Sequence, residues 1–149
     1  MTTMDELIDI LGAEEPDYDN EALTDPEIVP LLAALIGGTD RGLAAKAVAV
    51  ASEIADEEAV ALLRNAAASG DSIIRVATAA AVRNLEPDTA SEILTPLVQD
   101  TDPGVRYVAL GAVPESPTPE LVASIETISQ SETDSDVRER AEQILEGIA

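Results

Sequence analysis

The feature that most constrains this sequence is a pattern that returns every 31 or 32 residues. An acidic residue, two spacers, an aliphatic residue and an arginine occur at 71–75 (DSIIR), 102–106 (DPGVR) and 134–138 (DSDVR). A degenerate copy at 40–44 (DRGLA) ends in alanine in place of arginine. A fixed period of this length is typical of proteins built from small units that stack on one another.

Apolar residues keep the same register on both sides of the pattern. Upstream, a 31-residue spacing relates Leu32, Leu63, Leu94 and Ile125. Downstream, the small residues Ala47, Thr78, Ala109 and Ala141 lie three positions after the end of each copy. Because no segment shows the sustained period-two alternation of a strand, we predict an all-α chain with two helices per copy. The first helices are expected at about 26–37, 57–68, 88–99 and 119–130, and the second at about 41–54, 72–85, 103–113 and 135–148.

Helix starts are marked by an acidic residue followed by proline, at 25–26, 86–87 and 102–103. An acidic N-cap can accept a backbone N–H, and proline suits the first helical position. Pro30 and Pro96 fall inside first helices, where we expect a late start or a kink.

Residues 1–24 lie outside the repeat. Thr3 and Glu6 form a capping box, and a stripe of apolar residues follows up to Leu11, which predicts a short helix that covers the end of the first repeat. The segment up to residue 24 is expected to be a loosely held acidic linker. The predicted domains are therefore 1–24 and a repeat domain at 25–149, with repeats at about 25–55, 56–86, 87–117 and 118–149.

The segment ILTPLVQDTDPGVRYVALGAV (residues 93–113) resembles the HEAT repeat, and in particular the short HEAT-like repeats of phycobilisome-lyase relatives. The resemblance covers residues 25–149 and is best in the third copy. It departs in the first copy, which lacks the arginine, and in the fourth, where polar Ser129 stands in place of Ile36 and Val98. It implies a right-handed α-α superhelix, or solenoid, of about four two-helix repeats.

The resemblance also implies a structural role for the acid and the arginine of each copy. In HEAT repeats these residues form a hydrogen-bonded ladder between neighbouring repeats. The positions that match are Asp71, Arg75, Asp102, Arg106, Asp134 and Arg138. The chemistry agrees, because aspartate caps helices and arginine binds carboxylates through two parallel hydrogen bonds.

The charge of the chain restricts its partners. With 8 Lys and Arg against 30 Asp and Glu, the net charge is −22, which disfavours nucleic acids and anionic membranes. The acidity has two interpretations: a surface adapted to a salt-rich cytosol, as in halophiles, or an acidic face for a basic partner. No apolar run approaches a membrane span and the N-terminus is acidic, so we expect a cytoplasmic protein.

Catalytic chemistry has few candidate groups. The sequence has no histidine, no cysteine and a single lysine, Lys46, so we expect no enzymatic activity, no cofactor and no metal site. The acidic residues of the linker match part of the spacing of an EF-hand. Ala22 and Ile28 stand where that loop needs glycine and glutamate, so the match fails.

We expect a partner to bind the concave face that second helices form in a solenoid. Its predicted exposed positions lie one, four, five and eight residues after the end of each copy, at 100° per residue. The predicted groove residues are Val48, Val76, Arg83, Tyr107, Leu110 and Gly111. Tyr107 is the expected anchor, and a Tyr107→Glu/Leu110→Glu variant is expected to lose its partner while keeping its helices. The alternative is that packing buries these small residues between helices.

The sequence therefore favours a non-enzymatic adaptor or scaffold that binds a basic or amphipathic segment of another protein. One alternative is a small-molecule carrier or chaperone of the lyase-like branch. Another is a structural protein that assembles with itself through the same apolar strip.

Overall fold

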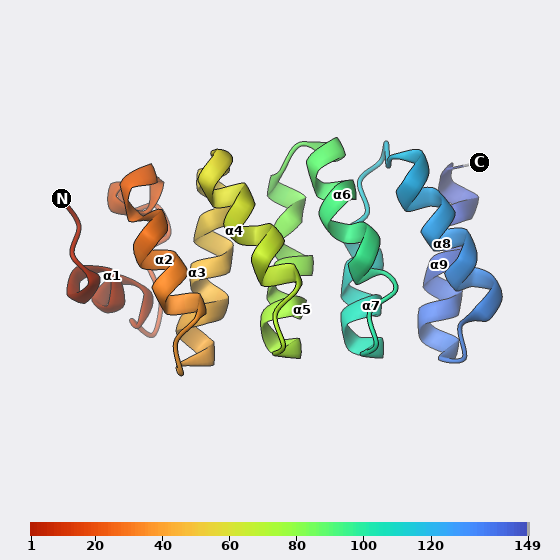
Figure 1. The fold of residues 1–149 in the computed structure, drawn as a ribbon, viewed down its shortest axis with the longest axis horizontal. Coiled ribbons are helices and arrows are strands. Elements are labelled where there is room, and N and C mark those ends of the chain that lie inside the picture. Colours follow the sequence, from red (N-terminus) through yellow and green to blue (C-terminus); the bar gives the residue numbers. More distant parts are fainter. Residues whose placement is uncertain (149) are drawn as a thin grey trace. The chain divides into compact units, whose positions relative to one another are not determined.

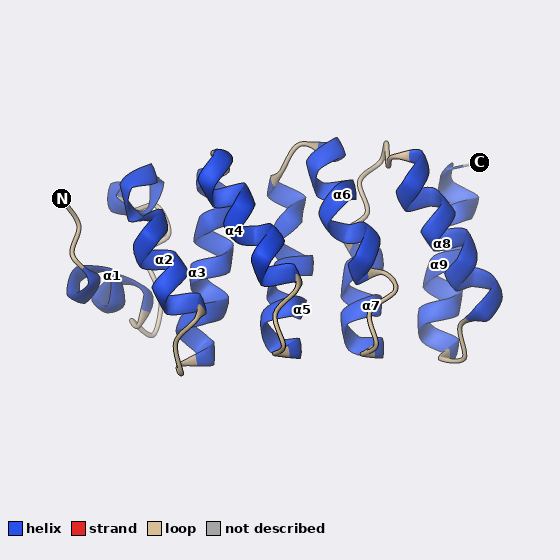
Figure 2. Cartoon of the chain, viewed as in Figure 1, coloured by secondary structure: helices blue, strands red, loops and turns tan. Residues whose placement is uncertain are grey.

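A computed structural model describes residues 1–148, and within that range every regular element is a helix (Figure 2). Contacts between residues divide the chain into two compact units, residues 1–78 and residues from 79 onward. The division falls within one helix, α5 (Ser72–Ala81).

The first unit is organised around one long helix, α3 (Arg41–Ile54). The other elements are α1 (Met4–Leu11), the 3₁₀ turns η1 (Glu21–Thr24) and η2 (Pro26–Ile28), α2 (Val29–Ile36), α4 (Glu57–Ala67) and the first part of α5. Figure 1 shows α2 and α4 in a layer in front of α3. Helix α3 packs against α1, η1, α2 and α4, so several of its sides are covered.

The second unit has the same two-layer arrangement. After a 3₁₀ turn, η3 (Val82–Asn84), it contains α6 (Pro87–Leu97), α7 (Pro103–Gly111), α8 (Pro119–Ser131) and α9 (Ser135–Ile148). Helices α6 and α8 lie in front of α7 and α9 (Figure 1). Each helix packs on its sequence partner and on its counterpart in the next pair: α6 on α7 and α8, and α9 on α7 and α8.

All eight predicted helices of the repeats are present, with small shifts at their ends. The first begins as 3₁₀ helix and becomes α-helical only at Val29, so that Pro30 falls in its first turn, which is the late start expected there. Pro96 lies inside α6, one residue before its end. The second predicted helix of the second copy is α-helical only to Ala81 and continues as η3.

Two of the three predicted acidic caps are confirmed. Asp25 Oδ1 accepts a hydrogen bond from Glu27 N at 2.9 Å, and Asp102 Oδ1 accepts one from Gly104 N at 2.7 Å. The prediction for Glu86 was wrong, because its side chain makes no capping hydrogen bond. Glutamate is one methylene longer than the short side chains that cap well. A threonine that the sequence analysis missed, Thr118, caps α8 through Leu121 N.

The N-terminal segment is held more firmly than expected. Thr3 Oγ1 caps α1 as predicted, at 3.2 Å from Glu6 N. The Lys46 ammonium of α3 donates to the Leu11 carbonyl at 2.7 Å, which places a cation at the negative end of α1. The expectation of a loosely held linker was wrong, because η1 packs on α3 and buries Leu23.

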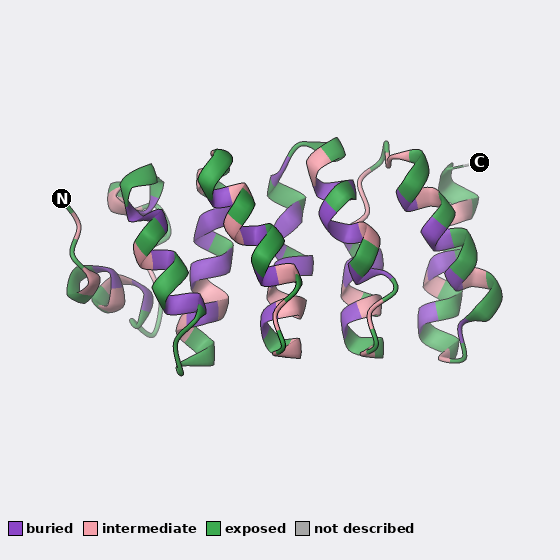
Figure 3. Cartoon of the chain, in the orientation of Figure 1, coloured by how far each residue is buried: buried purple, intermediate pink, exposed green. Residues whose placement is uncertain are grey.

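The core is built from aliphatic and small side chains, which form the buried stretches in Figure 3. On α3, Ala44, Ala47, Val48 and Ala51 are fully buried. Small side chains let helix axes approach closely, so the fold needs no aromatic residue inside either unit.

One described residue other than glycine has a positive φ: Ala55, at 53°, which caps α3 in the left-handed conformation. Alanine is strained there and glycine is not. We predict that Ala55→Gly raises the free energy of unfolding by about 0.5–1 kcal/mol. The relief of backbone strain stabilises the folded state by more than the added entropy of glycine stabilises the unfolded chain.

Urea denaturation measures this change. Ala68→Gly is the matched control, because Ala68 caps α4 with a φ of −100° and gains nothing from glycine. If Ala55→Gly were no more stable than the wild type, the left-handed cap would not be strained.

Candidate functional site

The structure places some of the six predicted groove residues at the surface and others in the core. Arg83, Tyr107 and Gly111 are exposed and Val76 is partly buried. Val48 and Leu110, however, are 0% and 1% exposed, so their prediction as surface residues was wrong. Glutamate at position 110 would therefore place a charge in the core, and the predicted double variant cannot test binding.

The reason lies in how much of each second helix is covered. The prediction assumed a single buried stripe facing the first helix. Helix α3 is covered by four other elements, and α7 packs on both α6 and α9. In the first three copies the buried arc therefore extends to the fourth position after the copy, whereas Glu142 at this position in the fourth copy is exposed. On α7 the outward face narrows to the first and fifth positions, Tyr107 and Gly111.

In the second unit, these positions form a surface that we call the α7–α9 face: Tyr107, Gly111, Glu139 and Gln143, all exposed. The Tyr107 side chain is 43% exposed and stands between two clefts. One has a volume of about 300 Å³ and is lined by Tyr107, Asp136, Glu139, Arg140 and Gln143. The other, of about 250 Å³, is lined by Pro103, Gly104, Tyr107, Asp134, Asp136 and Val137.

Tyr107 is held by an arginine that the sequence analysis missed. The Arg140 guanidinium lies over the ring, 4.1 Å from its centroid, and Nη1 donates to the Tyr107 carbonyl at 3.0 Å. A Cβ atom on Gly111 would lie 2.7 Å from Arg140 Nη2, so glycine leaves the space that the guanidinium occupies. The guanidinium therefore covers one face of the ring and restricts its orientation, while Tyr107 remains exposed. The repeat pattern marks Arg140 only weakly, because Lys46 in the first copy is the one other basic residue at the matching position.

The ladder residues of the second unit are in place, but with a different acidic partner. Arg106 Nε and Nη2 donate to the two carboxylate oxygens of Glu132 at 2.7 and 2.8 Å, and Nη1 donates to the Asp100 carbonyl at 2.8 Å. Asp102 and Asp134 serve instead as helix caps, accepting from Gly104 N and from the first turn of α9. Glu132 lies two residues before the motif aspartate, a position that is also acidic in the third copy (Asp100) but is Gly38 and Ser69 in the first two, and this partial signal was missed.

In the first unit, Asp71 caps α5 through Ile73 N at 2.9 Å and forms an ion pair with Arg41 at 2.9 Å. Arg75 Nη1 donates to the Ser69 carbonyl at 2.8 Å, the same six-residue step back that Arg106 makes. Arg138, at the end of the fourth copy, is exposed. The motif residues thus fix loops and helix starts.

The Arg106–Glu132 pair is largely shielded from solvent, with side-chain exposures of 15% and 4%. Burial acts to raise the pKa of the Glu132 carboxyl, but hydrogen bonds from Arg106 and from the backbone at 133 and 134, together with the charge of Arg106, lower it overall. Since the pKa is lowered in the folded state, the pair stabilises the fold above the ordinary pKa of about 4.5, and this contribution is lost as the pH falls below it.

No group of metal-ligating side chains occurs among residues 1–148. No helix in the same range is long and apolar enough to cross a membrane.

We predict that Arg106→Met lowers the free energy of unfolding at pH 7 by about 3 kcal/mol, because it leaves the Glu132 carboxylate buried without its partner. Adding Glu132→Leu should recover much of this loss, since no buried charge then remains. Urea denaturation from pH 7 to pH 3.5 should show the difference between wild type and Arg106→Met shrinking as the pH falls, because protonation of Glu132 removes the unpaired buried charge of the variant and then the ion pair of the wild type.

The control is Arg41→Met, which breaks an ion pair whose arginine side chain is 65% exposed and should cost less than about 1 kcal/mol. Equal losses in the free energy of unfolding for Arg41→Met and Arg106→Met would show that the buried ion pair stabilises the fold no more than the exposed one.

Comparison with solved structures gives 15 matching chains. One belongs to the complex of CpcE and CpcF of phycocyanin lyase from Nostoc sp. PCC7120. It is 24% identical, the match covers 95% of this chain and 96% of that chain, and the TM-score is 0.67. This likeness confirms the predicted fold class, an α-α superhelix of HEAT-like repeats of the lyase type. No curated protein matches the sequence.

A scan against protein families matches residues 66–146 to the model described as HEAT repeats. The matched residues include α7, α8 and most of α9, and so the α7–α9 face. Because they make up more than half of the chain, the chain belongs to the HEAT-repeat family.

Proposed function

We propose that this chain is a non-enzymatic scaffold that binds another protein, with Tyr107 as the anchor of the contact. The observation that carries the proposal is the exposed, oriented Tyr107 ring between two clefts. Tyrosine and arginine are enriched at the energetic centres of protein interfaces, where a rigid side chain loses little entropy on binding. Because Arg140 already restricts the ring in the free chain, less side-chain entropy remains to be lost when a partner binds.

The chemistry of the face indicates the kind of partner. Both clefts are lined by Asp136, joined by Glu139 in the larger and by Asp134 in the smaller, within a chain of net charge −22. Apolar surface is limited to Tyr107 and to small neighbours such as Pro103. A segment with one apolar side chain next to lysine or arginine would complement both features.

The comparisons support a protein partner in general terms. HEAT repeats present extended surfaces for binding, and the similar structure from Nostoc is a complex of two proteins. The same likeness supports a second candidate, a carrier or chaperone of a small molecule, because the protein in that complex is a phycocyanin lyase. The absence of histidine and cysteine from the sequence leaves few nucleophiles and is the reason that we propose no catalytic role.

We predict that Tyr107→Glu loses the partner while the helical content stays unchanged, since the side chain is exposed and its replacement leaves the core intact. Wild type and variant would be used as baits in a lysate of the source organism at multimolar KCl. High salt screens the charge of the bait and so removes proteins that bind by charge alone.

Ile73→Glu is the control. It places the same acidic side chain at another exposed apolar position, which lies in the first unit and lines neither cleft. A protein that both the wild type and Ile73→Glu capture, and that Tyr107→Glu loses, would support the proposal. Equal capture by all three would refute the anchor. A mass that rises with concentration, in the absence of any captured protein, would indicate self-assembly instead.

A further inference from the structure

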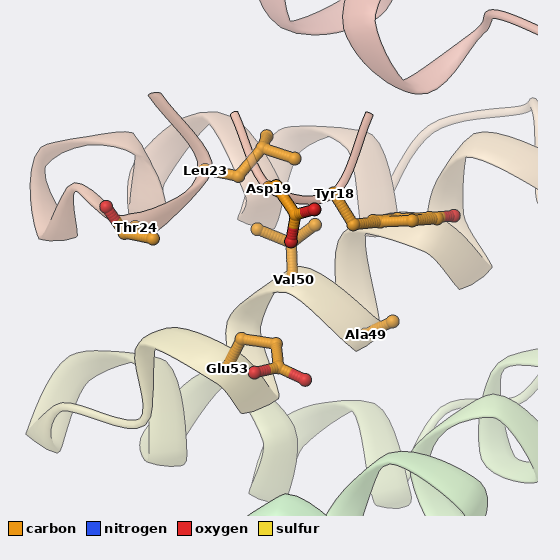
Figure 4. Close-up of a pocket in the computed structure, with 7 residues that line it drawn as sticks. All are labelled: Tyr18, Asp19, Leu23, Thr24, Ala49, Val50 and Glu53. Atoms are coloured by element: carbon orange, nitrogen blue, oxygen red, sulfur yellow. The ribbon is translucent and has the colours of Figure 1, made fainter. Parts of the chain in front are cut away.

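A pocket in the first unit lies between the linker and α3, and the function proposed above makes no use of it. It has a volume of about 580 Å³, within the range of small-molecule sites. Figure 4 shows Tyr18, Asp19, Leu23 and Thr24 of the linker on one side and Ala49, Val50 and Glu53 of α3 on the other.

The pocket is built by ordered structure. The Tyr18 amide donates to the Pro16 carbonyl, the Asp19 amide donates to the Asp17 carboxylate, and Asn20 caps η1 through Ala22 N. These turns, together with the packing of η1 on α3, hold the linker side chains in position over the helix. The cavity is therefore formed before any ligand arrives, which reduces the entropy lost on binding.

The lining combines apolar and acidic groups. Leu23 and Val50 form an apolar floor and are 3% and 2% exposed, and the Tyr18 ring, 51% exposed, forms a wall. Two carboxylates, Asp19 from the linker and Glu53 from α3, face the same space (Figure 4). No ion pair to either carboxylate occurs among the described residues.

We propose that this pocket binds an ammonium or guanidinium group carried on an apolar stem. The stem would cover Val50 and Leu23, and the cation would lie beside the Tyr18 ring between the two carboxylates. An anion is excluded by the two acids, and a wholly apolar ligand would leave both carboxylates partly desolvated without a partner. Two kinds of ligand carry such a cation on an apolar stem: a small organic amine, and an arginine or lysine side chain of a protein.

The test is a chemical-shift titration with butylguanidinium, and with butylurea as a neutral ligand of the same shape. We expect saturable binding of butylguanidinium that shifts the signals of residues 18–24 and 49–53, and at least tenfold weaker binding of butylurea. Glu53→Gln and Tyr18→Leu should each weaken binding about tenfold, while circular dichroism shows unchanged helical content.

Glu58→Gln is the control, because it removes the same charge from an exposed position on α4 outside the pocket. It should leave binding within twofold of the wild type. If Glu58→Gln weakened binding as much as Glu53→Gln, the attraction would come from the overall charge and the site would be refuted. Absence of saturation, or equal binding of butylurea, would refute it as well.

A third probe, the peptide acetyl-Gly-Arg-Gly-amide, distinguishes the two kinds of ligand. Tighter binding of the peptide than of butylguanidinium would identify a protein side chain as the ligand, and the reverse order would identify a small amine. Tyr107→Glu should not change any of these titrations, so either proposal, the pocket or the interface, can be refuted without the other.

Discussion

The packing of the second helices on small side chains is the constraint from which the other features follow. Ala47, Val48 and Ala51 of α3 and Ala109 and Leu110 of α7 are buried almost completely, although each helix has only a few turns. A helix covered by its partner helix and by neighbouring elements keeps only a narrow outward face. On α7 that face is Tyr107 and Gly111, and the narrowness of the face is why one aromatic ring dominates it.

Close packing also determines where polar groups can lie. The loops that join first and second helices bring backbone carbonyls and charged side chains next to buried surface, where each needs a partner. Arg106 meets this need in the second unit, because it binds Glu132 and the Asp100 carbonyl together. Asp102 and Asp134 are then left to cap helices. The aspartates and the arginine of the motif thus have separate structural tasks.

The repeat was sufficient to predict the helices, because its period, the Asp-Pro starts and the apolar register all report on local structure. It was not sufficient for contacts that depend on packing between helices. Val48 and Leu110 appeared exposed under a single-stripe geometry, although neighbouring elements cover them. Glu132 has an acidic counterpart only in Asp100, and Arg140 a basic one only in Lys46, so the folded arrangement was needed to relate them to Arg106 and Tyr107.

The central claim, that the chain binds a protein through the α7–α9 face, is tested most directly by hydrogen–deuterium exchange of the chain alone and with a captured partner. The account predicts slower exchange in α7 and in the first half of α9, with the exposed sides of α6 and α8 unchanged. Backbone amides become protected where binding suppresses local opening. Slower exchange confined to α6 and α8, with α7 and α9 unaffected, would contradict the account.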